Sequence, residues 1–154
     1  GPAGIGQVEV DMGEPSVFPQ ISIPLMELTY SVMPVSMGNP HCILFCPHPE
    51  EIALDVLGPA LEHHPVFPDR TNVEFVAVEG DQLRLRVWER GSGETLACGT
   101  GACASVAATY LNRRTGSDVL VHLRGGDLRI EIGDDGHLYM TGPAATVFEG
   151  EIDL

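Results

Sequence analysis

Apolar and polar residues alternate along much of the chain with the period of two that is typical of β-strands. The clearest case is 82–88, where Leu83, Leu85 and Val87 share one face and arginines occupy the other. Alternating segments and short apolar runs predict strands at 8–12, 25–32, 41–45, 71–78, 119–123, 128–132, 138–140 and 146–152. The proline-interrupted stretch 14–24 predicts an irregular crossing instead.

Two segments are predicted to be helical. Residues 102–111 are almost uncharged, and a helix that is apolar on all sides belongs inside a fold. A second helix is expected to begin at Pro49, with two acids in its first turn, and to end near Gly58–Pro59 or Glu62. Strands wrapped around a central helix give an α+β fold.

The chain is acidic and has the size of a single domain. It has 154 residues, and its 22 acidic and 8 basic side chains give a formal net charge of −14. Such a surface repels phosphate, so neither nucleic acid nor an anionic membrane is an expected partner. No apolar run approaches the roughly 20 residues that cross a bilayer. Four cysteines without a secretion signal favour free thiols in a reducing, cytoplasmic compartment.

All eight basic residues are arginine, and the chain contains no lysine. Without lysine the chain cannot form a Schiff base with pyridoxal phosphate or with a carbonyl substrate. It also cannot form a Walker A loop, which requires a lysine. We therefore expect no cofactor of these kinds on this chain.

A glycine-rich turn leads directly into the apolar helix at Cys98-Gly99-Thr100-Gly101. The first N–H groups of a helix have no partner within it, so they form a site suited to a carboxylate. A thiol at this position is expected to have a lowered pKa, and it would suit proton transfer at the α-carbon of an amino acid. Taken alone, Cys98 is explained equally well as a buried residue without a chemical role. Cys103, inside the helix, is expected to be a packing residue.

Four possible metal ligands, His41, Cys42, Cys46 and His48, fall within eight residues and suggest zinc as an alternative. However, Cys42 and Cys46 share one face of the predicted strand with Leu44, and His41 points to the other face. No Cys-x-x-Cys pair occurs in the chain. We therefore expect no metal site, and we interpret both cysteines as packing residues.

The stretch from Ala97 to Cys103, Ala-Cys-Gly-Thr-Gly-Ala-Cys, closely resembles the second cysteine motif of the diaminopimelate epimerase family. Met-Gly-Asn-Pro-His at 37–41, Arg-Thr-Asn-Val-Glu-Phe-Val at 70–76 and Trp-Glu-Arg-Gly at 88–91 agree with it in order and spacing. The resemblance implies a diaminopimelate-epimerase-like domain, with antiparallel and mixed strands in a barrel-like sheet around the central helix.

The family's first Cys-Gly-Asn-Gly motif does not occur in this sequence. The resemblance therefore identifies residues 1–154 as the C-terminal domain of a two-domain epimerase, with residues 143–154 belonging with the missing N-terminal domain. The last strand, at 146–152, is then expected to lack its partner and to be free to pair with a second copy, which would give a homodimer.

The resemblance also implies roles for individual residues. The family inverts one α-carbon of diaminopimelate with two cysteines, one removing a proton and one returning a proton, without pyridoxal phosphate. Cys98 is matched to one of these cysteines, and Glu89 and His41 are matched to catalytic groups near the thiols. The residues matched to substrate binding are Gly99 and Thr100 at the reacting carboxylate, Glu89 near the reacting amino group, and Asn39, Asn72 and Arg90 at the distal end.

These matches predict an isomerase, a diaminopimelate epimerase of lysine and peptidoglycan precursor synthesis, of which this chain supplies half of the active site. One thiol cannot reach both faces of a carbon, so the chain alone is expected to be inactive. Two alternatives remain open. One is a cysteine-pair racemase acting on proline or hydroxyproline, and the other is a carboxylate-binding module without catalysis.

Overall fold

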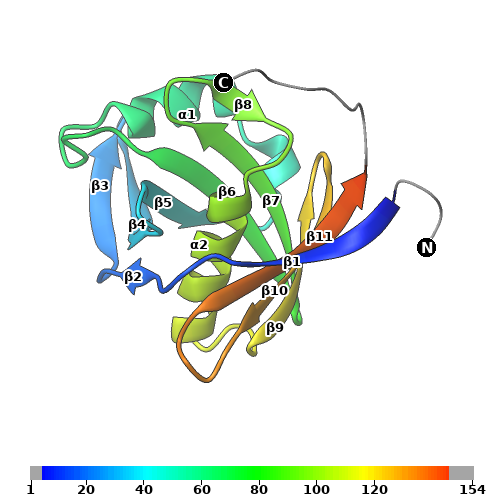
Figure 1. Cartoon of the computed structure of the whole chain (residues 1–154). Coiled ribbons are helices and arrows are strands. Elements are labelled where there is room, and N and C mark those ends of the chain that lie inside the picture. Colours follow the sequence, from blue (N-terminus) through cyan, green and yellow to red (C-terminus); the bar gives the residue numbers. More distant parts are fainter. Residues whose placement is uncertain (1–4, 146–154) are drawn as a thin grey trace, which may run out of the picture.

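The computed structural model describes residues 5–145, so the strand predicted at 146–152 lies outside the described residues (Figure 1). The strands are β1 (Ile5–Asp11), β2 (Ser16–Val17), β3 (Ile21–Leu25), β4 (Leu28–Ser36), β5 (Pro40–Phe45), β6 (Asn72–Glu79), β7 (Gln82–Glu89), β8 (Gly93–Thr95), β9 (Asp118–Leu123), β10 (Gly126–Ile132) and β11 (Leu138–Ala145). The helices are a 3-10 turn, η1 (Pro49–Glu51), α1 (Leu54–Glu62) and α2 (Gly99–Leu111).

The strands form a mixed sheet in the order β1-β11-β10-β9-β7-β6-β5-β4-β2, with β3 added to β4 and β8 to β7. Two neighbouring pairs on this path, β5 with β6 and β7 with β9, are parallel. Parallel neighbours need a crossover connection, and a helix lies in each crossover. Helix α1 connects β5 to β6, and α2 connects β7 to β9.

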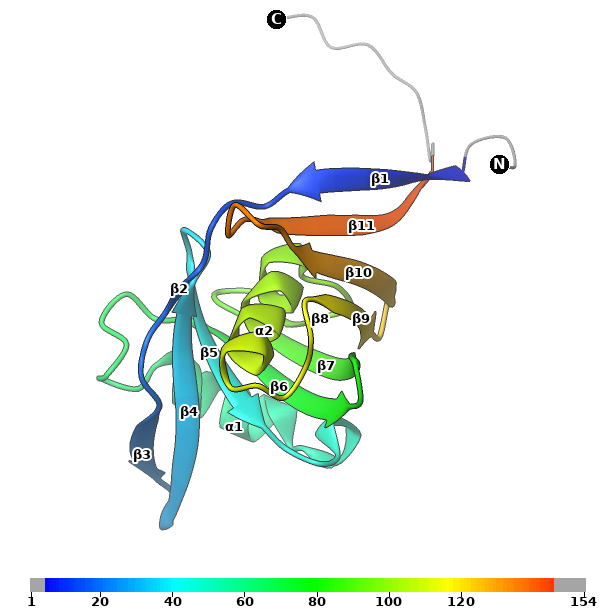
Figure 2. The same ribbon diagram turned by 90° about the horizontal axis from the view of Figure 1, so that it is seen from below.

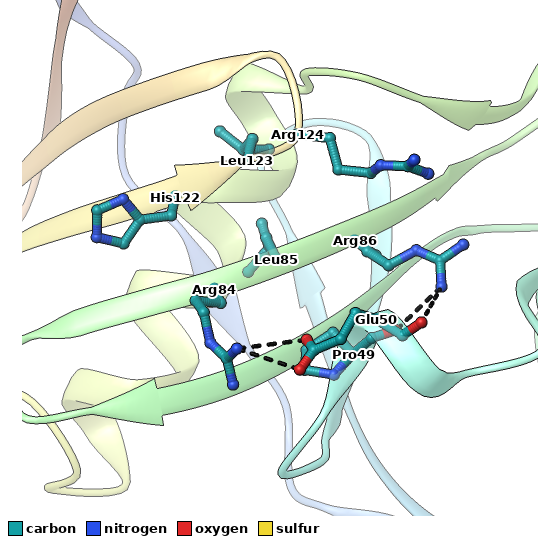
Figure 3. Close-up of a pocket in the computed structure, with 8 residues that line it drawn as sticks. All are labelled: Pro49, Glu50, Arg84, Leu85, Arg86, His122, Leu123 and Arg124. Atoms are coloured by element: carbon teal, nitrogen blue, oxygen red, sulfur yellow. Dashed lines mark hydrogen bonds and ion pairs between the residues drawn. The ribbon is translucent and has the colours of Figure 1, made fainter.

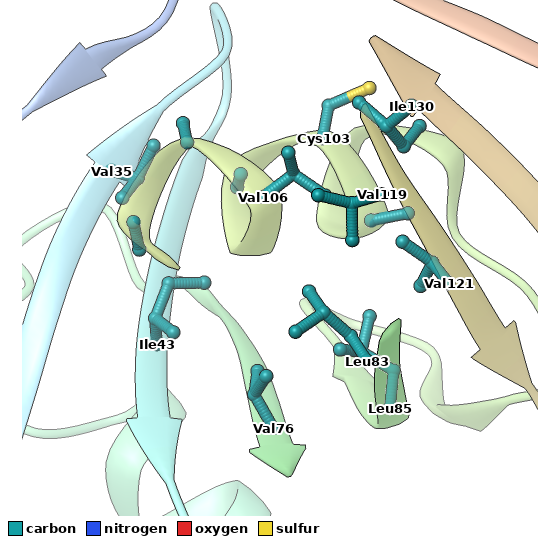
Figure 4. Close-up of a cluster of buried hydrophobic side chains, with 14 of the residues drawn as sticks. Val35, Ile43, Val76, Leu83, Leu85, Cys103, Val106, Val119, Val121 and Ile130 are labelled. Carbon is teal, nitrogen blue, oxygen red and sulfur yellow. The ribbon is translucent and has the colours of Figure 1, made fainter. Parts of the chain in front are cut away.

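The sheet curls around α2, which Figure 2 shows enclosed between β4 on one side and β9 and β10 on the other. Residues 101–109 of this helix are all buried, as expected for a helix without charges. The core around it is apolar and draws on most strands (Figure 4). It includes Val35, Ile43, Val76, Leu83, Leu85, Cys103, Val106, Val119, Val121 and Ile130. The predicted central helix is therefore confirmed.

A second apolar cluster packs α1 onto the opposite face of β5 and β6. Helix α1 runs to Glu62 and includes Pro59, so the Gly58–Pro59 pair does not end it. Gly58 allows close packing here, because a Cβ at this position would lie 2.6 Å from the ring of Trp88. The sheet thus has a helix on each face, one on its curled inner side and one outside.

Several local predictions need correction. The irregular crossing at 14–24 contains β2 and most of β3, and β3 pairs with β4 through a two-residue turn at Met26–Glu27. Both turn residues have positive φ, 47° and 66°, which is the geometry of a tight hairpin without the usual glycine or asparagine. The helix expected from Pro49 is instead the turn η1, and α1 starts only at Leu54.

The prediction of a sheet wrapped around a helix holds, and the wrapped sheet is open. Strand β1 lies at one end of the path and β2 at the other, and the described residues show no pairing between them. No helix in residues 5–145 is long and apolar enough to cross a membrane.

Candidate active site

Cys98 is the N-cap of α2, with extended backbone at φ −144° and ψ 105°. The N–H of Gly101 donates to its Sγ at 3.3 Å, and the Thr100 hydroxyl lies 3.6 Å from the same sulfur. Gly99 and Thr100 are the first two residues of the helix, so their N–H groups have no carbonyl partner within it. A half-buried thiol therefore stands beside two donors suited to a carboxylate.

The pKa of Cys98 is raised, to about 11, and not lowered as the helix start predicted. Burial is the main cause, since it disfavours the charged thiolate, and the carboxylates of Glu74 and Glu89 add to it. Hydrogen bonds from Thr100 and Gly101 act in the opposite direction and lower the pKa. The prediction failed because it considered the helix and not the burial and the two acids around the sulfur.

Two other predicted site residues, Asn39 and His41, connect to this thiol through hydrogen bonds. His41 is 1% exposed, and its Nε2 lies 3.1 Å from Oδ1 of Asn39. The Nδ2 of Asn39 donates to Oγ1 of Thr100 at 3.2 Å. The turn before β5, the strand itself and the start of α2 thus bring these side chains to one place.

Glu74 is a residue of this site that the sequence analysis did not single out. It is 0% exposed, and its Oε1 lies 2.6 Å from Nδ1 of His41. Burial raises the pKa of Glu74, and the contact with His41 opposes that rise. The signal was present in the sequence, because an acid in the apolar run Val73-Glu74-Phe75-Val76 has to be buried if both faces of that strand are covered.

Asn72 and Arg90 form a second group, at the ends of β6 and β7. The backbone N–H of Arg90 donates to Oδ1 of Asn72 at 2.7 Å, and Nδ2 of Asn72 donates to the carbonyl of Pro40 at 3.1 Å. The exposed Arg90 guanidinium donates to the carbonyl of Asp69 at 3.1 Å. Arg90 also lines a surface hollow with residues 66–70 and the turn that contains Gly38. This arrangement leaves Arg90 beside space that a ligand could occupy.

Glu89, at the end of β7, is half-buried, and Oγ1 of Thr95 donates to its Oε1 at 2.9 Å. Its charge contributes to the raised pKa values of both Cys98 and Glu74. The carboxylate is therefore close enough to the thiol to affect its ionisation.

The remaining cysteines have a different environment. Cys42 and Cys103 are 0% exposed in the two apolar clusters, and Cys46 is half-buried beside one of them. Burial raises the pKa of Cys103 to about 12 and that of Cys46 to about 11. His41 binds Glu74 and Asn39, and residues 5–145 contain no cluster of three or more metal-ligand side chains.

A separate pocket lies over β7, β9 and η1, and it contains three of the eight arginines (Figure 3). These arginines already have partners within the protein. Arg84 binds Glu50 at 3.2 Å, Arg86 binds Glu94 at 3.0 Å, and Arg124 binds the same Glu94 at 2.8 Å. None of the predicted site residues lines this pocket, and each of its arginines is paired with an acid of the chain.

Comparison with known proteins agrees with the resemblance seen in the motifs. Residues 33–147 match the family model described as diaminopimelate epimerase. Diaminopimelate epimerases from Desulfitobacterium hafniense and Leptospira biflexa are 54% and 45% identical to this chain over 90% and 97% of its length. The matches cover only 48% and 59% of those proteins, so the chain spans about half the length of the curated relatives it matches.

A solved structure of a probable proline racemase from Agrobacterium radiobacter K84 has the same fold, with a TM-score of 0.72 at 12% identity. The alignment covers 96% of this chain and 54% of that one.

Proposed function

The chain belongs to the diaminopimelate epimerase family, and from this premise we propose that it supplies one of the two thiol faces of an enzyme interconverting LL- and meso-diaminopimelate. The observation that carries the proposal is the position of Cys98. Its sulfur accepts from the N–H of Gly101 at the helix start, and the N–H groups of Gly99 and Thr100 directly follow Cys98 in the chain. Such a site places a carboxylate and a proton-transfer group side by side.

In the proposed mechanism the N–H groups of Gly99 and Thr100 bind the carboxylate on the reacting carbon. They also stabilise the negative charge that develops there when the α-proton leaves. Cys98 takes the proton from one face as thiolate, or returns it as thiol. A thiol with a raised pKa is a strong base once it is ionised, which suits a weakly acidic α-proton.

A second thiol must act on the opposite face, and we propose that the other half of the relatives' length supplies it. The missing N-terminal domain is therefore the proposed partner, with residues 143–154 belonging with it. A homodimer is the alternative assembly. One thiol serves only one face of a carbon, so the isolated chain is proposed to be inactive.

The distal end of the substrate is proposed to lie near Arg90, where the guanidinium borders the hollow at 66–70. Arginine binds a carboxylate with two parallel hydrogen bonds, and Asn72 holds the backbone of the same residue in place. Glu89 is proposed to face the reacting amino group, where its charge attracts an ammonium. A substrate with a second charged end fits this arrangement better than proline does.

The wider setting follows from the same proposal. The chemistry is proposed to be independent of pyridoxal phosphate, and this chain itself has no lysine to hold that cofactor. The enzyme is proposed to act in lysine and peptidoglycan precursor synthesis. The reducing cytoplasm is the proposed location, where the four free cysteines stay reduced.

The test uses the two-domain protein, in which this chain is joined to its N-terminal domain. Cys98→Ala is expected to reduce the interconversion of LL- and meso-diaminopimelate by at least about a hundredfold, as loss of a proton-transfer group does. Cys46→Ala, which removes a half-buried thiol elsewhere, is the matched control and retains activity. Activity that survives Cys98→Ala would favour a carboxylate-binding role, and conversion of proline in place of diaminopimelate would favour a proline-type racemase.

A further inference from the structure

A continuous line of buried and half-buried side chains joins Glu74 to the sulfur of Cys98. It passes through His41, Asn39 and Thr100. We propose that Glu74, His41 and Asn39 are positioning residues that direct the Thr100 hydroxyl to donate its hydrogen bond to Sγ of Cys98. This inference rests on the proposed function, since it concerns the thiol that the proposal makes catalytic.

The first step is the pair formed by Glu74 and His41. Oε1 of Glu74 lies 2.6 Å from Nδ1 of His41, and both side chains are shielded from water. Nε2 of His41 faces Oδ1 of Asn39, which can only accept, so Nε2 is the donor of this hydrogen bond. A ring that donates from Nε2 either accepts at Nδ1 from a protonated Glu74 carboxyl or donates from both nitrogens.

Glu74 has no other hydrogen-bond partner in the described part of the chain, because its Oε2 is buried and unsatisfied. A buried carboxylate oxygen without a donor is costly, and nothing in the packing of the strand requires an acid here. The carboxyl group is therefore explained by its contact with His41.

The second step is Asn39, which passes the donor-to-acceptor direction of the hydrogen bonds from His41 to Thr100. Its Oδ1 accepts from Nε2 of His41 at 3.1 Å, so its Nδ2 faces Thr100 and donates to Oγ1 at 3.2 Å. The Thr100 hydroxyl has a single proton. Because Oγ1 already accepts from Asn39, that proton is free to point at Sγ of Cys98, 3.6 Å away.

The result is a thiol with two donors, the Gly101 N–H and the Thr100 hydroxyl. Both favour the thiolate against burial and against the nearby acids. Gly101 permits this arrangement, since a Cβ there would lie 2.7 Å from Oε1 of Glu74 and 3.1 Å from Sγ of Cys98. Asn39 thereby receives a role different from the distal substrate contact that the family resemblance implies.

The test measures the rate at which iodoacetamide alkylates Cys98 in this chain at pH 8, by mass spectrometry of the cysteine-containing peptides. The rate follows the thiolate fraction. Cys46, outside the line of hydrogen bonds, is the internal reference in every sample. Thr100→Val, which keeps the shape and removes the hydroxyl, is expected to slow alkylation about two- to fivefold. Thr100→Ser keeps the hydroxyl and is expected to react like the unaltered chain.

Asn39→Asp tests the direction of the line. The carboxylate of an aspartate at this position accepts on both sides, so the Thr100 hydroxyl turns away from the sulfur and alkylation slows. The added charge also slows it, so the double variant with Thr100→Val separates the two effects. If Asn39 acts through Thr100, the factor by which alkylation slows in the double variant is smaller than the product of the factors for the two single variants. Independent effects that simply multiply would overturn this step.

Glu74→Leu removes the hydrogen-bond partner of His41 and is expected to slow alkylation of Cys98 at least about twofold, because the imidazole ring is then free to turn. Glu74→Gln keeps an N–H that can donate to Nδ1 and is expected to restore the rate. Thermal unfolding of each variant shows whether it is folded. If Glu74→Leu is not folded, the Thr100 and Asn39 variants decide whether the proposal stands. An unchanged rate in Thr100→Val or in a folded Glu74→Leu overturns the proposal. The assay needs no substrate and no second domain, so this outcome is independent of whether the epimerase assignment stands.

Discussion

At the scale of single residues, two buried carboxylates show how their partners decide their charge. Glu62, at the end of α1, accepts from Nε1 of Trp88 at 2.9 Å, from the N–H of Gly91 at 2.9 Å and from the Arg70 guanidinium. Burial alone raises the pKa of Glu62, but these hydrogen bonds outweigh it and lower the pKa. Glu74 has only His41, and its pKa is raised.

We therefore predict a pH-dependent effect of Glu62→Gln. It lowers the free energy of unfolding by about 1–3 kcal/mol at pH 7, because a buried charge-assisted network is broken. A carboxylate with a lowered folded pKa stabilises the fold above its unfolded pKa, near 4.5, and this contribution is lost as the pH falls through the folded value. Denaturant unfolding at pH 7 and pH 3 should show the difference from the unaltered chain shrinking at pH 3.

Glu50→Gln is the control for this prediction, since Glu50 is exposed and pairs with Arg84 on the surface. It should leave stability unchanged at pH 7. A difference for Glu62→Gln that is the same at both pH values would contradict the explanation.

Residue identities in the site could be predicted from motifs, but their electrostatic state could not. Cys98 and Thr100 were identifiable because a glycine-rich turn before an apolar helix is visible in the sequence. The raised pKa of Cys98 was not, because it depends first on burial of the sulfur and then on Glu74, which is distant in sequence and is brought to the sulfur by β6. The burial of Glu74 could be predicted only if both faces of β6 were already known to be covered.

At the scale of elements, the site depends on how closely the first turn of α2 packs against β6. Gly101 lies at this contact, and the Glu74 carboxylate and the Cys98 sulfur border the space that a Cβ at this position would occupy. A side chain at this position forces one of these two groups to move.

Gly101→Ala is predicted to destabilise the chain by about 1–3 kcal/mol in spite of the higher helix propensity of alanine, because overpacking a buried contact costs more. Chemical unfolding measures this directly. Gly116→Ala is the matched control, since its Cβ would lie at an ordinary 3.6 Å from Asp81. Gly101→Ala as stable as the unaltered chain would show that β6 and α2 can separate at this point.

Elements with a clear period were predictable, and elements that depend on partners were not. Strands β7, β9 and β10 follow from alternation, β6 follows from its apolar run, and α2 follows from its lack of charge. The β3–β4 hairpin was hidden because its turn, Met26–Glu27, lacks the residues that usually mark positive φ. The short β8 exists only because β7 offers it an edge.

At the scale of the whole molecule, four thiols are held inside or beside the two apolar clusters that flank the sheet. All four have raised pKa values. The folded chain therefore keeps protons that the unfolded chain releases above pH 9, the ordinary value for these thiols. The sign follows directly, because a state that binds more protons loses stability as the pH rises.

We predict that the free energy of unfolding falls steeply above pH 9. Each thiol contributes up to about 1.4 kcal/mol per pH unit in this range. Cys103→Ala removes the contribution of one thiol and should reduce the slope by about that amount between pH 9 and 11. Ser105→Ala, a buried position on the same helix that does not titrate, is the control and should keep the full slope. Equal slopes for the two variants would contradict the account.

The whole chain spans about half the length of its curated relatives and presents one half-buried thiol at a helix start. The measurement that tests this account most directly is the loss of α-deuterium from labelled LL-diaminopimelate. It compares the chain alone, the chain with the N-terminal domain added back, and the same pair carrying Cys98→Ala. We predict exchange only in the intact pair. Exchange with inversion by the isolated chain, or undiminished exchange with Cys98→Ala, would contradict the assignment of this chain as one thiol face of a two-thiol epimerase.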